Sequence, residues 1–359
     1  MKRKDRLKRL VGGPRRILIG LSLVLAFAAS ALVLLLSGSL EGEQEGVDQW
    51  PDDMVERGVV AQKAAPVLDP VALHDGLEDV AQGHEGIYGV AVLDPDSGTK
   101  ISLRGEEQFM AASIGKLPVF ATLYRAGAQG ELDLQEEIPV LPEDIRDYGE
   151  GVIPDPPEDD FLTLRESSYR MVNHSDNVAW SMLDRRLGTQ RIRSELEEMG
   201  IRNSWYSDDL SGYYTTPNDV LLLLEKIFDP QFTSEEFSAE MLNAMTETHI
   251  EDRIPEKLPL GVRVAHKTGT YGENFGDAGI VFYEDSRGVM KHYYLVVLAK
   301  DCTTGESEAR DAIQSISRAT YEALTGTEVD PSWSRGEFSS SLREEEALDQ
   351  ERTPESYLP

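Results

Sequence analysis

Alternating and helical patterns of apolar residues predict a mixed fold for the middle of the chain. Residues 86–93 alternate as a strand, and an Asp-Pro-Asp-Ser-Gly turn leads into a second strand at residues 100–103. A long section at residues 113–250 is mainly helical in pattern, and helical patterns also lie at residues 71–81 and 306–324. Three more strand-like runs follow the long helical section, at residues 263–267, 279–283 and 292–298. Strands at both ends with helices between them predict an α/β protein, more narrowly α+β, in which a helical subdomain interrupts one sheet.

The beginning of the chain has a different pattern. Residues 1–16 carry eight basic residues and one acidic residue, and an uncharged apolar run follows within residues 17–37. Twenty such residues in a helix span about 30 Å, the thickness of a bilayer's hydrocarbon core. A cleaved signal peptide is the alternative, because Ala-Phe-Ala at residues 26–28 resembles a cleavage site, but the apolar run continues past it. We therefore expect a single-pass signal anchor at residues 17–37, with the basic flank in the cytoplasm and the rest outside.

The remaining chain divides by composition into three parts. Residues 38–70 are acidic and lack periodic hydrophobicity, which predicts a linker. Residues 71–326 contain the predicted helices and strands and form the expected folded domain. Residues 327–359 are rich in Ser, Glu and Arg and are predicted to be a disordered tail.

The charge and the cysteine content of the chain argue against several classes of function. The formal net charge is −30, and because residues 1–16 carry +7, the remainder carries −37. A chain segment this acidic is repelled by the phosphate backbone of nucleic acids, which argues against nucleic-acid binding. Cys302 is the single cysteine, so an intrachain disulfide or a Cys-rich zinc site is excluded. The six histidines show no metal-ligand spacing, and we expect neither metal nor cofactor.

One serine–lysine pair is a candidate for nucleophilic chemistry. Ser113 lies three residues before Lys116 at the start of a predicted helix, so hydroxyl and amine share one face. Burial favours the neutral form of an amine, which can then accept a serine proton. The alternative is a helix cap beside a surface lysine. That alternative is serious because Ser97 and Lys100 have the same spacing inside a predicted turn.

Two tripeptides elsewhere in the sequence favour the catalytic interpretation of Ser113 and Lys116 over the helix cap. Ser175-Asp176-Asn177 lies between helical stretches, and Lys267-Thr268-Gly269 ends a strand-like run. Each tripeptide is expected by chance about 0.04 times in a chain of this length. Taken singly, the first could be a helix cap and the second an ordinary strand end. Their joint occurrence after Ser-x-x-Lys, in this order, is not explained by chance.

The three motifs in this order resemble those of the penicillin-recognising serine hydrolases, specifically the class A β-lactamase-like branch. Residues 162–188, 215–219 and 261–281 also look like the family's segments around its second and third motifs. The resemblance covers residues 71–324. It implies a β-lactamase/transpeptidase-like fold, with an antiparallel sheet, terminal helices and an inserted helical subdomain.

The resemblance also implies roles for the catalytic group. Ser113 would be the acylated nucleophile and Lys116 the residue that activates it. Ser175 would pass a proton to the leaving nitrogen. Asn177 would hold the side-chain amide of the substrate and orient Lys116.

The third motif would bind the rest of the substrate. Lys267 would place a cation opposite the substrate carboxylate, with Thr268 and Thr270 hydrogen-bonded to that carboxylate and Gly269 between them. The backbone N–H groups of Ser113 and Thr270 would form the oxyanion hole.

One departure from the family concerns deacylation. Class A β-lactamases carry a glutamate in the omega loop, but residues 200–217 here form a shorter stretch without glutamate. Asp208 and Asp209 are its only carboxylates, and either could be the base or an ordinary loop residue. Glu197 and Glu198 precede the stretch on a helix whose charges are expected to face solvent.

These features predict an extracytoplasmic active-site serine hydrolase that forms an acyl-enzyme with β-lactams and releases it slowly. One alternative is a D,D-peptidase acting on D-alanyl stem peptides of peptidoglycan. The other is a wall-binding module without turnover, against which the intact nucleophile and base argue. The expected partners are a β-lactam or D-alanyl-peptide substrate and the membrane, reached through the N-terminal helix.

Overall fold

The computed structural model describes residues 59–62, 68–146, 151–154, 157–206 and 212–340. The chain divides into two units, residues 1–49 and 50–359, and every described residue belongs to the second. The predicted anchor at residues 17–37 lies outside the described residues. Within the described ranges, no helix is long and apolar enough to cross a membrane.

A five-stranded antiparallel sheet forms the centre of the second unit, in the order β3-β2-β11-β10-β9. Its strands are β2 (Ile87–Asp94), β3 (Thr99–Leu103), β9 (Arg263–Tyr271), β10 (Asn274–Glu284) and β11 (Met290–Lys300). All five had been expected from their patterns, but β9, β10 and β11 are longer than predicted. Most of their added residues are polar or small, so the apolar pattern alone underestimates the paired length.

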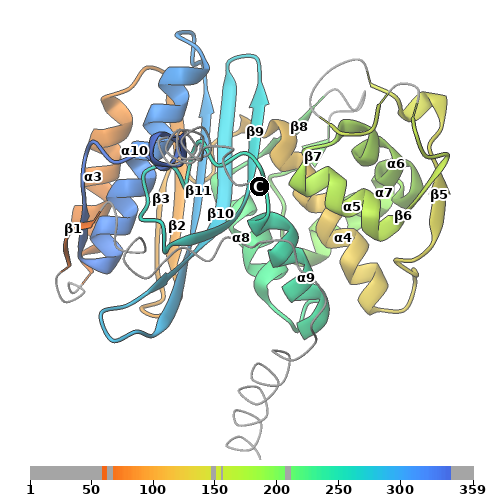
Figure 1. Ribbon diagram of the computed structural model, residues 1–359, viewed down its shortest axis with the longest axis horizontal. Helices are drawn as coiled ribbons and strands as arrows, with labels where there is room; N and C mark the ends of the chain where they lie inside the picture. The colour runs from red at the N-terminus through yellow and green to blue at the C-terminus, as the bar shows by residue number, and fades with distance from the viewer. Residues whose placement is uncertain (1–58, 63–67, 147–150, 155–156, 207–211, 341–359) are drawn as a thin grey trace, which may run out of the picture. The chain divides into compact units, whose positions relative to one another are not determined.

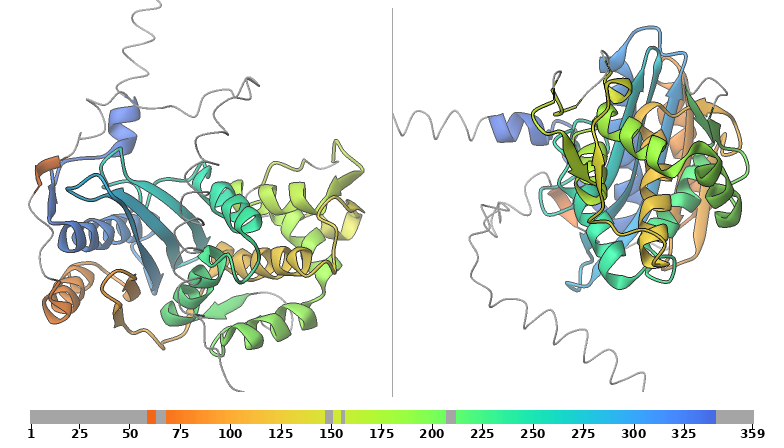
Figure 2. Two further views of the ribbon diagram at one scale, coloured as in Figure 1. Left: turned by 90° about the horizontal axis from the view of Figure 1, so that it is seen from below. Right: turned by 90° about the vertical axis from the view of Figure 1, so that its right-hand side faces the viewer.

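Helical layers cover both faces of this sheet (Figure 1). Helices α3 (Pro70–Gln82) and α10 (Glu306–Thr325) lie on one face, and the helical subdomain lies on the other, as Figure 2 also shows. Leu295 and Val297 of β11 pack in the core under α3 and α10, whereas Val296 and Leu298 pack against the subdomain. This period-two alternation buries both faces of the strand.

The helical subdomain contains most of the middle of the chain. Its helices are α4 (Lys116–Ala128), α5 (Leu164–Asn173), α6 (Asn177–Leu187), α7 (Thr189–Met199), α8 (Pro217–Phe228) and α9 (Glu235–Thr246). Short strands link them: β4 (Phe109–Met110), β7 (Trp205–Tyr206) and β8 (Tyr213–Thr215) form one sheet, and β5 (Glu137–Pro139) pairs with β6 (Phe161–Thr163). Helix α4 is buried from Lys116 to Tyr124 and runs through the centre of this subdomain, with Phe120 and Leu123 in its core. The predicted α+β fold with an inserted helical subdomain is confirmed.

The predicted boundaries of the folded domain are too narrow. Strand β1 (Val59–Gln62), within the expected linker, pairs antiparallel with β12 (Thr327–Val329), within the expected disordered tail. The predictions of a linker at residues 38–70 and of a disordered tail at residues 327–359 are therefore wrong for these strands and for the chain up to residue 340. Val329 is 3% exposed and joins the core under α10, so a few apolar residues spaced far apart suffice to fix this segment. Asp69 and Pro70 of the expected linker also cap and begin α3, and residues 38–58, 63–67 and 341–359 lie outside the described residues.

Candidate active site

Ser113 lies immediately before the central helix of the subdomain. It belongs to the 3₁₀ turn η2 (Ala112–Gly115), and Lys116 is the first residue of α4. Residues three apart lie on the same side of a 3₁₀ turn, and the Nζ atom of Lys116 lies 3.0 Å from the Oγ atom of Ser113. Ala112 has a φ of 48°, an uncommon conformation for a residue with a side chain, which turns the chain into η2. The serine and lysine predicted as a pair are thus in contact.

Lys116 is fully buried and surrounded by oxygen atoms. Its Nζ atom donates to the Ser175 carbonyl at 2.5 Å and to the Asn177 Oδ1 atom at 2.8 Å, and it lies 3.1 Å from the Ser175 Oγ atom. The ring of Trp180 lies 5.2 Å from the same nitrogen. These contacts hold the amine between the first and second motifs.

The second motif connects α5 to α6 through a strained residue. Ser175 has a φ of 55° and is 4% exposed. Asp176 then caps α6: its Oδ1 atom accepts from the backbone N–H of Ala179 at 2.9 Å. Its Oδ2 atom accepts from the N–H groups of Val152 and Ile153 at 2.6 and 2.9 Å. One carboxylate therefore fixes both the helix and the neighbouring loop, which explains the aspartate in the motif.

The third motif lies on β9 and contacts the second. Lys267 is 2% exposed, and its Nζ atom lies 3.1 Å from both the Ser175 Oγ atom and the Thr268 carbonyl. The Ser175 hydroxyl thus lies between the side-chain nitrogens of two buried lysines. A Cβ atom on Gly269 would lie 2.4 Å from the Ala111 carbonyl, so glycine is needed for β9 to approach the Ser113 turn. All three motifs meet at this point.

Arg253 also lies at this site, although no pattern in the sequence singles it out. Its side chain is 2% exposed and lies beside the end of β9. Its guanidinium donates to the carbonyls of Gly269 and Gly276 at 2.7 and 2.6 Å and to the Thr270 Oγ1 atom at 2.5 Å. A single arginine in a loop carries no recognisable spacing, so only the fold could find it.

A buried histidine–aspartate pair supports the same strands from behind. The His266 Nδ1 atom lies 2.9 and 3.0 Å from the two carboxylate oxygens of Asp277, and both side chains are fully buried. Asp277 also accepts from the backbone N–H of Ile254 at 3.0 Å. Burial alone would raise the pKa of Asp277, but the charge and hydrogen bond of His266, together with Arg253 and that N–H, lower it. The pair ties β9 and β10 to the loop that carries Arg253.

The second Ser-x-x-Lys match has no such surroundings. Ser97 and Lys100 lie at the exposed turn between β2 and β3, and the Ser97 Oγ atom donates to the Asp94 Oδ2 atom at 2.6 Å. The Ser97 side chain therefore stabilises the turn.

The stretch expected in place of the omega loop is a short hairpin. Strands β7 and β8 flank residues 207–211, and the Tyr213 carbonyl accepts from the N–H of Ala111 at 2.9 Å, next to the Ser113 turn. Asp208 and Asp209 lie outside the described residues. Glu198 is mostly exposed and pairs with Arg125, as expected for a solvated helix face.

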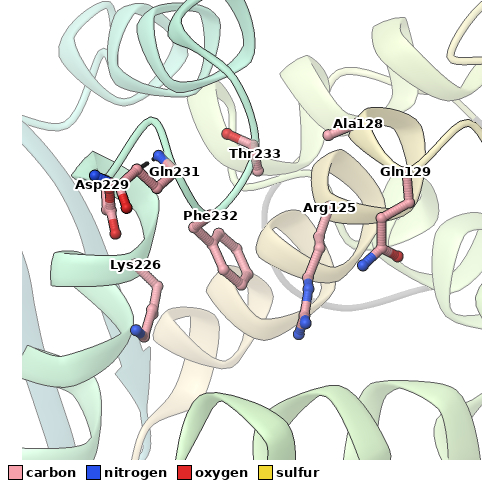
Figure 3. A pocket seen from close by; sticks show the side chains of 8 residues that line it. All are labelled: Arg125, Ala128, Gln129, Lys226, Asp229, Gln231, Phe232 and Thr233. Atoms are coloured by element: carbon pink, nitrogen blue, oxygen red, sulfur yellow. Dashed lines mark hydrogen bonds between the residues drawn. The ribbon is translucent and has the colours of Figure 1, made fainter. Parts of the chain in front are cut away.

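A separate hollow of about 380 Å³ lies at the other end of α4 (Figure 3). Arg125 and Phe232 line it, with the guanidinium 5.2 Å from the ring centroid. Glu195 and Glu198 already bind that guanidinium, at 2.7 and 3.1 Å. Because Ser113 precedes the opposite end of α4, this hollow is distinct from the candidate active site.

Comparisons with known proteins agree with this geometry. The family model described as "Beta-lactamase enzyme family" matches residues 72–324. The extended-spectrum β-lactamase PER-1 of Pseudomonas aeruginosa is 26% identical over 270 residues, covering 70% of this chain and 86% of that protein. The β-lactamase VEB-1 of the same organism is 23% identical over 217 residues, covering 56% of this chain and 73% of that protein.

Solved structures are similar over the same region. An L158E mutant of PBP-A, solved as an acyl-enzyme complex with penicillin G, is 25% identical with a TM-score of 0.65, covering 72% of this chain and 98% of that one. An ancestral class A β-lactamase has the same fold, with a TM-score of 0.65 at 23% identity, and covers 70% of this chain and 99% of that one. The resemblance read from the three motifs is confirmed, and the chain belongs to the β-lactamase enzyme family, with class A β-lactamases among its relatives.

Proposed function

We propose that this protein is an extracytoplasmic active-site serine hydrolase that is acylated by β-lactams at Ser113 and releases the acyl group slowly. The observation that carries the proposal is the convergence on Ser175 of two buried lysines, Lys116 and Lys267, with Ser113 in contact with the first. A helix cap at the surface or an ordinary strand end would not require two buried lysines beside one hydroxyl. A binding module without turnover would have no need for the nucleophile and base together.

Acylation can be written with the groups in contact. Lys116, as the neutral amine, accepts the proton of the Ser113 hydroxyl while the oxygen attacks the β-lactam carbonyl. The Ser175 hydroxyl, held between Lys116 and Lys267, delivers a proton to the ring nitrogen as the C–N bond breaks. Ser175 takes its proton back from Lys116, which had accepted one from Ser113, so both side chains return to their starting states. The product is an ester on Ser113 and a secondary amine in the opened ring. No other co-reactant is needed.

The end of β9 supplies the charge for a carboxylate. Lys267 of β9 and Arg253 are both buried cations, and Arg253 donates to the Oγ1 atom of Thr270, three residues after Lys267 on the strand, while it also pairs with Glu306 at 3.3 Å. Both β-lactams and D-alanyl peptides carry a carboxylate next to the scissile amide, and a fixed pair of cations matches that group. Arg253 thus extends the carboxylate site beyond the residues that the motifs identify.

Slow release is proposed because acylation and deacylation use different groups. The residues for the first step are present, but the stretch at residues 200–217 contains no glutamate to activate water. Loss of a general base lowers the rate of its step by about 10²–10⁴-fold. Either Asp208 or Asp209 could replace it, which a direct test can decide.

Intact-mass spectrometry with penicillin G tests the proposal. We expect a one-to-one adduct on Ser113 that forms within minutes and persists after free penicillin is removed. Rapid release that collapses in Asp208→Asn or Asp209→Asn would identify an aspartate base and overturn slow release in the native protein. Turnover of a D-alanyl-D-alanine peptide, with or without a penicillin adduct, would favour the D,D-peptidase alternative. Absence of both activities would contradict the proposed hydrolase.

The extracytoplasmic location rests on the basic flank and apolar run at residues 1–37. Protease added to spheroplasts should degrade the catalytic domain while a cytoplasmic marker survives. Full protection of the domain would contradict this location.

A further inference from the structure

The chain continues past the end of the family match and folds back against residues 256–262, which precede β9. The family match ends at residue 324 and α10 at Thr325, but the described chain continues to residue 340. After β12, the Asp330 side chain closes a turn by accepting from the Ser332 N–H at 2.8 Å. We call residues 330–340 the C-terminal segment.

A buried arginine anchors this segment to a turn of the catalytic domain. The Arg335 side chain is 9% exposed. Its Nε atom donates to the Leu258 carbonyl at 2.9 Å, and its terminal nitrogen donates to the carbonyls of Pro259 and Val262 at 2.5 Å each. A planar guanidinium with several fixed donors holds three carbonyls in one arrangement, which a flexible ammonium cannot do.

Further contacts hold the same turn. The Trp333 Nε1 atom donates to the Leu258 carbonyl at 3.0 Å, and the Arg335 N–H donates to the Glu256 carbonyl at 3.0 Å. In return, the Glu256 side chain accepts from the Gly336 N–H at 3.2 Å. Side-chain and backbone groups of the C-terminal segment therefore bind residues 256–262 along most of their length.

This turn connects the two parts of the carboxylate site. Arg253 precedes it, and β9, which carries Lys267, begins directly after Val262. At the Arg253 end, the Ile254 N–H donates to Asp277 at 3.0 Å and its carbonyl accepts from Ser317 of α10 at 2.8 Å. The other end is the one that the C-terminal segment holds.

We propose that the C-terminal segment, through Arg335, is a positioning element that holds residues 256–262 so that Arg253 and β9 keep the spacing needed to bind a substrate carboxylate. Arg335 touches none of the catalytic residues, so it is a positioning residue. The inference rests on the proposed function for its kinetic consequence, but its structural consequence is independent of catalysis.

The kinetic test compares Arg335→Met with a matched control in the full-length protein. Arg287→Met is the control, because the Arg287 side chain is 74% exposed and, among the described residues, forms an ion pair with Asp285 of its own turn. Acylation rate constants per folded molecule are measured with penicillin G and with its methyl ester, which lacks the carboxylate. We expect Arg335→Met to lower the ratio of the two constants about 10- to 100-fold, since small displacements at a binding site cost that much. A merely structural role would lower the folded fraction and leave the ratio unchanged.

Amide hydrogen exchange provides the second readout and needs no activity. Peptides covering residues 264–276 should exchange faster in Arg335→Met than in the wild type or Arg287→Met, while peptides of α4 stay unchanged. If Arg335→Met fails to fold, Arg335→Lys is used, with smaller changes in the same direction. An unchanged ratio, or exchange that rises equally throughout the domain, would overturn the proposal. A wild type that forms no adduct refutes the proposed function instead, and the exchange data then decide on the positioning role alone.

Discussion

The two serines that precede a lysine by three residues have the same spacing but different surroundings. Ser113 is in contact with a fully buried lysine, whereas Ser97 donates to Asp94 in an exposed turn. We therefore expect Ser113→Ala to abolish covalent labelling by a fluorescent penicillin. Ser97→Ala is the matched control and should be labelled at the wild-type rate, because its loss affects only hydrogen bonds within an exposed turn, to Asp94 and Thr99. Labelling that persists in Ser113→Ala, followed by peptide mapping to another serine, would refute the assignment.

At the scale of elements, Asp176 joins a helix to a loop, and the two contributions can be separated. In Asp176→Asn, the Oδ1 atom can still cap α6, but an amide group replaces the oxygen that accepts from Val152 and Ile153. We expect a loss of about 1–3 kcal/mol in unfolding free energy, because two N–H groups lose their acceptor. Asp176→Ala also removes the cap and should cost a further 0.5–2 kcal/mol or so. Chemical denaturation measures both.

The matched control for these variants is the cap of another helix. Ser234 accepts from the Phe237 N–H at 3.0 Å and caps α9. Ser234→Ala should lower stability by about 1 kcal/mol and leave penicillin acylation unchanged. Acylation should fall in Asp176→Asn, because Asp176 directly follows Ser175. Equal acylation in the two variants would show that the loop contact does not position the second motif.

At the scale of the whole molecule, the sequence could predict what depends on neighbouring residues. Alternation predicts β2, an apolar run predicts β11, and helical patterns predict α3 and α10, because each pattern depends only on residues close together in the sequence. The motifs of Ser113, Ser175 and Lys267 were recognisable because each is short and contiguous.

Contacts between distant and individually ordinary residues could not be predicted in this way. Arg253 reaches Gly269 and Gly276, 16 and 23 residues away, and the β1–β12 pair joins the two ends of the domain. Arg335 lies in a segment whose composition is typical of disorder, yet three carbonyls and burial fix it in place. Such contacts have no periodicity and follow only from the assembled fold.

The whole fold should lose stability in acid in two steps, and the first involves histidines. Burial lowers the pKa of His292, and burial together with the charge of His249 lowers the pKa of His174. The unfolded chain then binds protons more readily than the folded chain once the pH falls below about 6.5. Stability is therefore full above that pH and falls as the pH drops toward the lower folded-state values.

The second step involves Asp277 and lies at lower pH. The pKa of Asp277 in the folded protein is lowered, despite the opposing effect of burial, by the charge and hydrogen bond of His266, by Arg253 and by the Ile254 N–H. The contribution of this carboxylate is therefore present above a pH of about 4 and is lost as the pH falls through the folded-state value.

Denaturation curves from pH 7.5 to 3 can test the first step through His292. This ring packs against Phe228, with centroids 4.4 Å apart, and against Phe282 at 6.0 Å, so His292→Phe keeps an aromatic ring there and removes its titration. One histidine contributes at most about 1.4 kcal/mol per pH unit, and this variant should flatten the decline between pH 7 and 5 by part of that amount. His74→Asn is the matched control, because this histidine lies half-exposed on α3, outside the aromatic cluster, and its loss should leave the slope unchanged. A decline in His292→Phe as steep as in the wild type would show that proton uptake elsewhere governs acid sensitivity in this range.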